Sequence, residues 1–376
     1  MANYWVKAGD AGADTGTFAD PFASIQSAMD VYVAGDNVYL IESTETLATA
    51  ITVTRSGSTQ NYARFIPCDT SGNIDWSKRY TLDASSTAAN CLYFNANCAY
   101  IHFAGLELIN STNSNVAHNS SYSSQAIIFY QCNMDDSASL GLTTTYLLCY
   151  LINCTINGNA AYGVAGSNTN ANGHGCQLMY NGTRGVGSAG TNRVWTDSLF
   201  HGNNNRGYEY DLLLNAGCIY DDNLSYGILH VKVSGTNDGE IFDTRITNHT
   251  SAPGQGEQIN GPMAAGNNFF YNNTTDISVG AGYTYLDEYT RYKAANSSDG
   301  YANRAADNFK LSPTGEGVNI EIPIGAYDAT TVNTSWVCQG NLPPEYNPAG
   351  AVLSAPGWDG FGRRYMNAQF NGGVNG

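Results

Sequence analysis

The sequence CTINGNAAYGVAGSNTNANGHGCQLMYNGTRGV, residues 154–186, contains the same pattern twice, and this repetition decides the fold. Cys154 opens the first copy, and Cys176 opens the second copy 22 positions later. The same interval leads back to Cys132 and forward to Ser198, and Cys218 follows after 20 residues. A recurring period of this length is typical of a solenoid, in which each coil buries its apolar side chains only by stacking on its neighbours.

An asparagine recurs a few residues after each of the last four anchors. These asparagines are Asn157, Asn181, Asn203 and Asn223. Asparagine tolerates the left-handed backbone conformation and hydrogen-bonds its own backbone, as tight turns between strands require. We therefore interpret these asparagines as structural turn residues.

A Tyr-Gly or Arg-Gly pair follows each of these asparagines. The first residues of the pairs are Tyr162, Arg184, Arg206 and Tyr226. If they stack on one another, they form a ladder of aromatic rings and guanidinium groups. Aromatic faces pack on sugar rings and guanidinium groups donate paired hydrogen bonds, so this ladder is a candidate glycan-binding surface. The alternatives are a ladder that only stabilises the coils, or an interface with a second copy of the chain.

The composition indicates a β-rich chain with few charges. Charged residues make up 13% of the 376 residues, about half of the usual fraction, and Gly and Tyr are abundant. This suits many short strands joined by tight turns. The formal net charge of −16 argues against binding to nucleic acid or anionic lipid. The longest apolar run, residues 146–152, is too short to cross a membrane. The sequence predicts no metal site and no cofactor.

The N-terminal residues and the cysteines indicate where the chain folds. The N-terminus lacks the basic and apolar pattern of a secretion signal, so we expect synthesis in a cytoplasm. The cysteine number, nine, is odd, and several cysteines occupy equivalent coil positions. Cysteine packs well as a small apolar residue, so we predict reduced structural thiols inside the coils.

The chain divides into three parts. Residues 1–36 are predicted to form an N-terminal cap with a helix, in which Asp20 is the N-cap and Pro21 the first helical residue. Its apolar face is predicted to contain Phe22, Ile25, Met29 and Val33. Residues 37–328 carry the coils. Residues 329–376 are irregular and are expected to be a C-terminal cap or an assembly tail.

Short motifs at both ends of the coil region carry a resemblance to a known fold. At the N-terminus they are Tyr4-Trp5-Val6, Gly9-Asp10, Gly16-Thr17, Pro21-Phe22, Ile25-Gln26 and Gly35-Asp36-Asn37-Val38-Tyr39. At the C-terminus they are Asn308-Phe309-Lys310-Leu311-Ser312-Pro313 and Ile324-Gly325-Ala326-Tyr327. With these motifs the chain resembles the right-handed parallel β-helix superfamily, which includes pectate lyases, polygalacturonases and many phage tailspikes. The resemblance covers most of residues 1–328 and implies an all-β, right-handed parallel β-helix. It does not imply one function, because these scaffolds serve lyases, hydrolases and adhesins.

Two catalytic patterns of that superfamily are compared with the chain. Polygalacturonases combine an Asp pair with Gly-His-Gly and Arg-x-Lys, and the corresponding residues here are Asp221-Asp222, Gly173-His174-Gly175 and Arg291-Tyr292-Lys293. The order differs, because in that family the Asp pair precedes the histidine. Pectate lyases require a calcium-binding carboxylate cluster beside an Arg or Lys, and the regular coils show no such arrangement.

Aligning the coils gives a further set of catalytic candidates. Asp211 follows Ser198 by 13 residues, Glu257 follows Thr244 by the same interval, and His230 lies on the intervening coil. Two coils separate the carboxylates by roughly 10 Å, near the spacing of an inverting glycosidase. The candidate catalytic residues are therefore Asp211, Asp221, Asp222, Glu257 and His230. The alternative is that these are solvated turn residues.

These observations lead to one favoured function and two alternatives. We expect a phage virion surface protein, either a fibre-like or spike-like adhesin or a head decoration, with a structural and glycan-binding role. The alternatives are a polysaccharide-degrading hydrolase or lyase, and a bacterial surface adhesin. The resemblance implies a homotrimer. We expect other virion proteins to bind residues 329–376 and a host surface polysaccharide to be a further partner, with no nucleic acid and no membrane insertion.

Overall fold

The computed structural model describes most of the coil region. The described residues are 1–59, 61–145, 147–166, 171–187, 193–209, 212–231, 239–242, 244–251, 253–261, 263–266, 268–281, 285–288, 291–292, 301–303 and 308–311. The predicted tail 329–376 and Asp211 lie outside the described residues.

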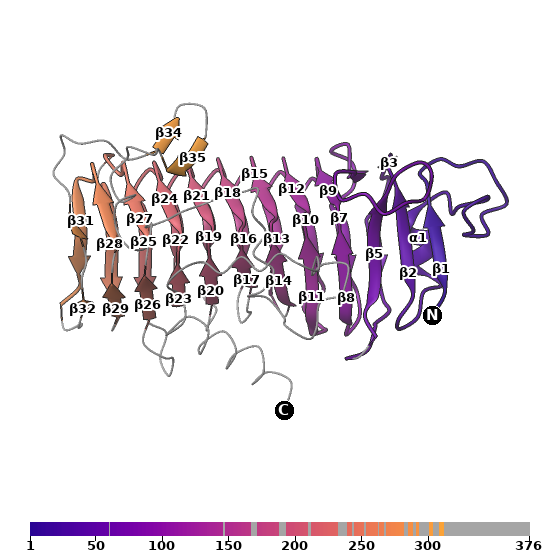
Figure 1. Ribbon diagram of the computed structural model, residues 1–376, viewed down its shortest axis with the longest axis horizontal. Helices are drawn as coiled ribbons and strands as arrows, with labels where there is room; N and C mark the ends of the chain where they lie inside the picture. Colours follow the sequence, from indigo (N-terminus) through magenta and orange to yellow (C-terminus); the bar gives the residue numbers. More distant parts are fainter. Residues whose placement is uncertain are drawn as a thin grey trace.

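Three parallel sheets run along a rod, and the chain visits them in rotation (Figure 1). Sheet 1 has the order β1 (Asn3–Val6), β2 (Asn37–Ile41), β5 (Ala63–Cys68), β8 (Ala99–Ala104), β11 (Ser124–Tyr130), β14 (Leu147–Ile152), β17 (Ala171–His174), β20 (Arg193–Thr196), β23 (Leu212–Ala216), β26 (Gly239–Phe242), β29 (Met263–Gly266) and β32 (Tyr285–Glu288).

Sheets 2 and 3 follow sheet 1 within each coil. Sheet 2 has the order β3 (Ser43–Thr46), β6 (Tyr80–Asp83), β9 (Leu106–Ile109), β12 (Asn133–Asp135), β15 (Thr155–Asn157), β18 (Gln177–Met179), β21 (Leu199–His201), β24 (Ile219–Asp221), β27 (Arg245–Thr247), β30 (Phe269–Tyr271) and β33 (Arg291–Tyr292). Sheet 3 has the order β4 (Ile51–Val53), β7 (Asn90–Phe94), β10 (Ser114–His118), β13 (Leu140–Thr143), β16 (Tyr162–Ala165), β19 (Arg184–Gly187), β22 (Arg206–Glu209), β25 (Tyr226–Val231), β28 (Gln255–Asn260) and β31 (Thr275–Val279). An antiparallel hairpin joins β34 (Tyr301–Asn303) and β35 (Asn308–Leu311).

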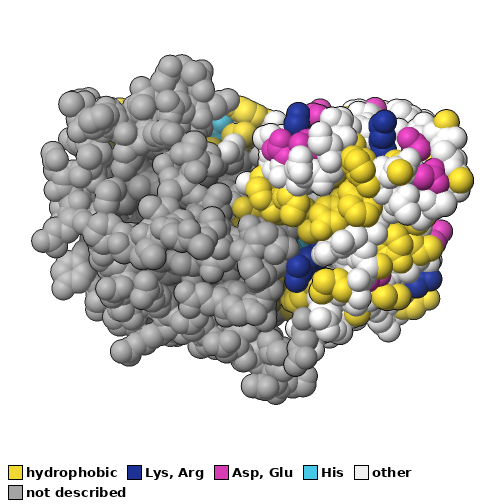
Figure 2. All heavy atoms as spheres, turned by 45° about the vertical axis from the view of Figure 1, so that its right-hand side comes forward, with side chains coloured by type: hydrophobic (Ala, Val, Ile, Leu, Met, Phe, Trp, Pro, Cys, Tyr) yellow, Lys and Arg dark blue, Asp and Glu magenta, His cyan; other side chains and the backbone are white. Residues whose placement is uncertain are grey.

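Along each strand, side chains point alternately into the β-helix and out of it. In β11, Ile127 and Phe129 belong to the main core, whereas Ile128 and Tyr130 belong to a second apolar cluster. The rings of Phe103 and Phe129 stack in the core with centroids 5.5 Å apart. The second cluster contains Ala104, Ile128, Tyr130 and Ile152, with Tyr62, Trp76 and Tyr150 packed against it. On the face of the N-terminal coils in Figure 2, apolar side chains form patches between sparse charged groups.

The interior cysteines behave as the sequence predicts. Cys132, Cys154, Cys176 and Cys218 are buried, and their thiols lie within hydrogen-bonding distance of backbone carbonyl oxygens. All eight cysteines of the described residues are free thiols. Burial raises the pKa of the Cys91 thiol to about 12, so this group stays protonated.

Three of the four recurrent asparagines, Asn181, Asn203 and Asn223, form an internal ladder and are structural, but none of the four has the left-handed conformation that was expected. Asn181 Nδ2 donates to Asn203 Oδ1 at 3.0 Å, and Asn203 Nδ2 donates to Asn223 Oδ1 at 2.8 Å. Each amide oxygen also accepts the backbone N–H of the asparagine in the preceding coil. These amides therefore satisfy backbone groups that a sharp turn would otherwise leave buried without partners.

The left-handed position precedes each ladder asparagine. The residues with positive φ at this turn are Gly158, Tyr180, Gly202, Asp222, Asn248 and Asn272. In the coil of Cys154 the ladder residue is Asn159, not Asn157, because Asn157 is the last residue of β15. His249 continues the ladder after Asn223, with its Nε2 3.5 Å from the Asn223 amide.

The N-terminal helix is shorter than the sequence predicted. Helix α1 (Ile25–Met29) begins after Ser24, whose side chain accepts the backbone N–H of Ser27, so Asp20 is not the N-cap. Phe22 bridges to β1 instead of starting the helix, and Val33 is exposed. A five-residue helix against β1 and β4 is therefore present, but a longer capping helix is not shown. Within the described part of the chain, no helix has the length and apolarity to cross a membrane.

Candidate functional site

The predicted Tyr–Arg–Arg–Tyr ladder forms on sheet 3. Tyr162, Arg184, Arg206 and Tyr226 open four successive strands, β16, β19, β22 and β25, and they are in register with one another. Register follows from the repeat, since each of the four residues lies eight positions after the anchor residue of its coil. The stacking predicted from the sequence is thus present, and its glycan-binding role stays a prediction.

Each arginine of the ladder lies over a tyrosine ring. The guanidinium carbon of Arg184 is 5.1 Å from the Tyr162 ring centroid, and that of Arg206 is 5.0 Å from the Tyr226 centroid. Both distances are in the range of cation–π contacts. The two side chains are only 17% and 18% exposed, so the guanidinium groups are held against the surface of the rod.

Glu209, which the sequence did not single out, joins the two arginines. Its carboxylate lies 2.5 Å from Arg184 Nε and also pairs with Arg206 Nη1. Glu209 is nearly buried, at 6% exposure. Its position three residues after Arg206 was visible in the sequence, but alternation alone would place the two on opposite faces of a regular strand. Two guanidinium groups and one carboxylate give this cluster one net positive charge.

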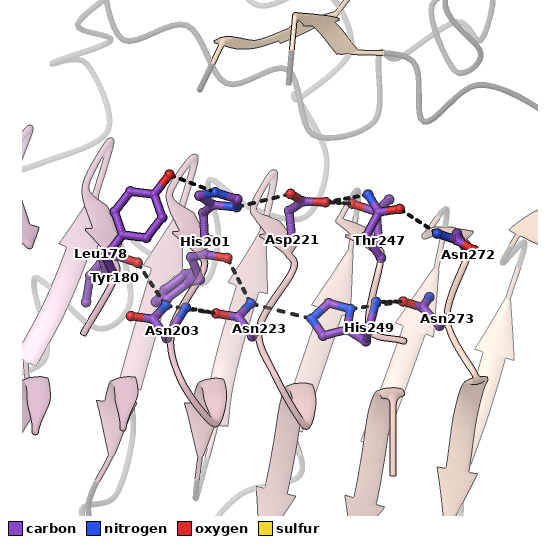
Figure 3. Close-up of polar contacts among 12 residues, drawn as sticks. Leu178, Tyr180, His201, Asn203, Asp221, Asn223, Thr247, His249, Asn272 and Asn273 are labelled. Carbon is purple, nitrogen blue, oxygen red and sulfur yellow. Dashed lines mark hydrogen bonds and ion pairs between the residues drawn. The ribbon is translucent and has the colours of Figure 1, made fainter. Parts of the chain in front are cut away.

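A second polar group lies at the last residues of three strands of sheet 2, where His201, Asp221 and Thr247 are in register. Asp221 is fully buried and accepts hydrogen bonds from Thr247 Oγ1 at 2.6 Å and Asn248 Nδ2 at 2.7 Å. Its other oxygen lies 3.1 Å from His201 Nδ1, and His201 Nε2 lies 3.1 Å from the hydroxyl of Tyr180 (Figure 3). We call Tyr180, His201 and Asp221 the relay.

Proton positions in the relay follow from its chemistry. When Asp221 is ionised it only accepts hydrogen bonds, and the proton between Asp221 and His201 then sits on Nδ1. In the neutral imidazole, Nε2 is then the acceptor for the Tyr180 hydroxyl. The relay therefore connects a buried carboxylate through a histidine to a phenol that is 45% exposed.

The turn next to the relay positions the tyrosine. Tyr180 occupies the left-handed turn position with φ 51°, and the equivalent residue one coil later is Gly202 with φ 60°. A Cβ at Gly202 would come within 2.7 Å of the Tyr180 ring. The absence of a side chain at Gly202 thus lets the ring lie across the turn and reach His201.

No protein-family model matches the chain, and no curated protein matches it. Among solved structures, the chain is similar to the pectate lyase Pel9A, with a TM-score of 0.61 and 15% identity over 89% of this chain and 97% of that one. The chain is a right-handed parallel β-helix. A rhamnogalacturonan lyase has a TM-score of 0.48 at 12% identity, covering 87% and 95%. ORF18 of Geobacillus virus E2 has a TM-score of 0.44 at 15% identity, covering 78% and 62%. At these identities the similarity concerns the fold and not the function.

The β-helix separates the residues of the polygalacturonase-like pattern. His174 ends β17 of sheet 1, with Nδ1 2.9 Å from Thr196 Oγ1, whereas Asp221 ends β24 of sheet 2. Asp221 and Asp222 also differ, since Asp221 is buried in the relay and Asp222 is an exposed turn residue with φ 49°. The first two motifs therefore do not form a common site, and Lys293 of the third motif lies outside the described residues.

Of the predicted carboxylate pair, only Glu257 lies in the described coils. Glu257 is fully buried and in register with Ile228, a core residue, so it points into the β-helix. His230 is also fully buried, in register with core residue Ile259. Asp211 lies outside the described residues. A buried Glu257 is in no position to meet a polysaccharide from solvent.

The spacing of two residues in the sequence is a signal for the relay. His201 and Asp221 both lie three residues after their anchors, Ser198 and Cys218, and this makes them neighbours on adjacent coils.

On the same row of sheet 2, Asp135 pairs with Ile109, and its pKa is raised to about 7, mainly by burial. Across the described residues, no group of three or more His, Cys, Asp or Glu side chains is arranged to hold a metal ion.

Proposed function

We propose that this chain is a surface protein of a phage particle whose β-helix binds glycan through the Tyr162–Arg184–Arg206–Tyr226 ladder. The observation that carries this proposal is the register of these four residues, with each guanidinium group lying on a tyrosine ring. Side chains held in this way lose little conformational freedom when a ligand binds.

The chemistry of the ladder suits a sugar chain. Tyr162 and Tyr226 are partly exposed, and aromatic rings pack on the apolar faces of sugars. Glu209 occupies only part of the donor capacity of two guanidinium groups, each of which has five N–H donors. The remaining donors suit sugar hydroxyl or carboxylate oxygens. With one net positive charge, the cluster is a local exception in a chain of net charge −16.

A virion location and a homotrimeric assembly are part of the same proposal. The free, buried cysteines support folding in a reducing compartment such as a host cytoplasm. Residues 329–376 are proposed to hold the trimer together and to attach it to other virion proteins. Light scattering on the full chain and on a chain lacking these residues tests this. We expect a trimer and a folded monomer respectively, and a truncated chain that still assembles would contradict the role of the tail.

The glycan test compares binding to a panel of bacterial surface polysaccharides by biolayer interferometry. Tyr162→Ala and Tyr226→Ala are each expected to weaken binding by about 5-fold or more, since one stacked aromatic ring contributes about 1 kcal/mol or more. The matched control is Tyr122→Ala, which removes a tyrosine that is 37% exposed outside the ladder. Equal binding by all three variants would exclude the ladder as the glycan site.

One set of candidates for the alternative of a polysaccharide-degrading enzyme was the carboxylate pair of Asp211 and Glu257. Burial of Glu257 in the core removes this support. A reducing-sugar assay run beside the binding measurements tests the alternative directly, and release of oligosaccharides would favour it over an adhesin.

A further inference from the structure

The relay has the geometry that converts a hydroxyl group into a nucleophile. Nucleophilic catalysis by a hydroxyl requires a base within hydrogen-bonding reach and a third group that orients the base. Tyr180 Oη and His201 Nε2 are 3.1 Å apart, and His201 Nδ1 and Asp221 Oδ2 are 3.1 Å apart. Both distances lie within the range expected for such a site, about 2.6–3.2 Å.

We propose that Tyr180, His201 and Asp221 form a hydrolytic site for esters of small carboxylic acids, such as acyl groups on glycan hydroxyls. Tyr180 is the nucleophile, His201 is the general base and acid, and Asp221 is a positioning residue. This activity goes beyond the proposed glycan binding and does not depend on the Tyr–Arg ladder.

The exposed fraction of the side chains falls along the relay from Tyr180 to Asp221, as this chemistry requires. Tyr180 is 45% exposed, His201 is 6% exposed and Asp221 is fully buried. A substrate can therefore approach the phenol, while the carboxylate is shielded from water. Thr247 and Asn248 both donate to Asp221 Oδ1, which leaves Oδ2 to hold the His201 ring in one tautomer.

The first half of the reaction transfers the acyl group to the protein. The Tyr180 O–H bond breaks and its proton passes to His201 Nε2, while the phenolate oxygen forms a bond to the acyl carbon. The carbonyl π electrons move to oxygen and then re-form the carbonyl as the bond to the alkoxide breaks. The alkoxide takes the proton from His201, so an alcohol leaves and an acyl-tyrosine remains.

The second half returns the protein to its starting state. A water molecule gives a proton to His201 Nε2 as its oxygen attacks the acyl carbon. The bond to the phenolate breaks, the phenolate recovers the proton from His201, and the carboxylic acid leaves. Ester and water are thus converted to alcohol and acid without another reactant. Phenolate is a better leaving group than an alkoxide, which favours this step.

Ester hydrolysis fits the relay better than cleavage of a glycosidic bond. A glycosidase acts with two carboxyl groups placed on either side of the scissile bond. Here the single carboxylate of the relay is buried behind the histidine and cannot contact a substrate. For an ester, the one histidine can serve every proton transfer.

The test uses p-nitrophenyl acetate with the full-length protein. Release of p-nitrophenol is followed by absorbance, and the acetyl group is located by mass spectrometry of proteolytic peptides. We expect acetyl transfer to Tyr180, and we expect Tyr180→Phe to lower the rate by about 100-fold or more. Tyr122→Phe, which alters another exposed tyrosine, is the matched control and should keep the wild-type rate.

A second variant tests the base. His201→Gln keeps a polar side chain and should slow acetylation of Tyr180 by about 100-fold, with circular dichroism and thermal midpoint showing an intact fold. Wild-type rates in Tyr180→Phe, or acetylation of surface lysines and Tyr122 without Tyr180, would overturn the proposal. Because Tyr180 is exposed, its variant is expected to fold whether or not the histidine variant does.

Discussion

Arg184 and Glu209 form an ion pair between neighbouring strands, with Nε and Oε2 2.5 Å apart, and Arg206 binds the same carboxylate. Glu209 is therefore the residue that fixes the spacing of the two guanidinium groups in the ladder. Without it, two like charges would face each other across adjacent strands, which is destabilising.

Replacing Glu209 should destabilise the coils around it. Glu209→Gln is expected to lower the free energy of unfolding by about 2 kcal/mol, because a nearly buried partner of two arginines loses its charge. The matched control is Glu42→Gln, which removes a 48% exposed partner of Lys78 and should cost less than about 1 kcal/mol. Urea denaturation measures both, and equal effects would contradict the structural role of Glu209.

A substitution in the asparagine ladder should lower the free energy of unfolding more than a substitution in the neighbouring turn. Asn203→Ala is expected to cost about 3 kcal/mol, because Asn203 Nδ2 donates to the Leu178 carbonyl and its oxygen accepts the Asn181 N–H. Asn204→Ala changes an exposed side chain of the same turn and should stay within about 0.5 kcal/mol of wild type. Thermal and chemical unfolding measure the free energy of unfolding of both variants. A small effect at Asn203 would mean that water replaces the ladder.

Substitution of Gly202 measures how much the contact with the Tyr180 ring contributes to stability, apart from backbone strain. Gly202→Ala introduces both a left-handed alanine and a contact with the Tyr180 ring, whereas Gly9→Ala at φ 70° meets no atom within 4 Å. We expect about 1 kcal/mol of strain in each variant and a further loss of about 1 kcal/mol or more at Gly202. Calorimetry of both variants gives the difference. Equal losses would show that the ring moves freely away from the turn.

The stability of the protein should depend on Asp135 between about pH 4 and pH 7. Burial raises the pKa of Asp135 from 3.8 to about 7 in the folded chain, with smaller contributions from Asp136 and Glu107. In this range the unfolded chain has released the proton and the folded chain still holds it, so stability falls as pH rises. The loss is at most about 4 kcal/mol, reduced by the partial exposure of the side chain.

Asp135→Asn removes this proton and keeps an oxygen that can accept the backbone N–H of Asn157. The variant is expected to lose less stability than wild type between pH 4 and pH 7 in denaturant titrations. The matched control is Asp222→Asn, an exposed carboxylate of the same sheet edge. An identical pH slope in wild type and Asp135→Asn would show that the carboxyl group ionises freely in the folded state.

The sequence by itself determined the repeat and everything that depends on equal coil lengths. Cys154 and Cys176 are equivalent, so their thiols had to lie in the same interior row, and Tyr162 had to stack beside Arg184. In such coils, counting residues is enough to place side chains next to each other, because each strand repeats the position of the last.

Only the tertiary structure decided which side chains meet where the coil length or the backbone direction changes. Glu257 and Ile228 pair although 29 residues separate them, and the added residues bring Glu257 to an inward position that a constant interval did not predict. One residue of slip exchanges the inner and outer faces of a strand, so counting fails there. The sequence period also does not specify that Glu209, at the end of β22, reaches the two arginines, or that Tyr180, in its left-handed turn, reaches His201.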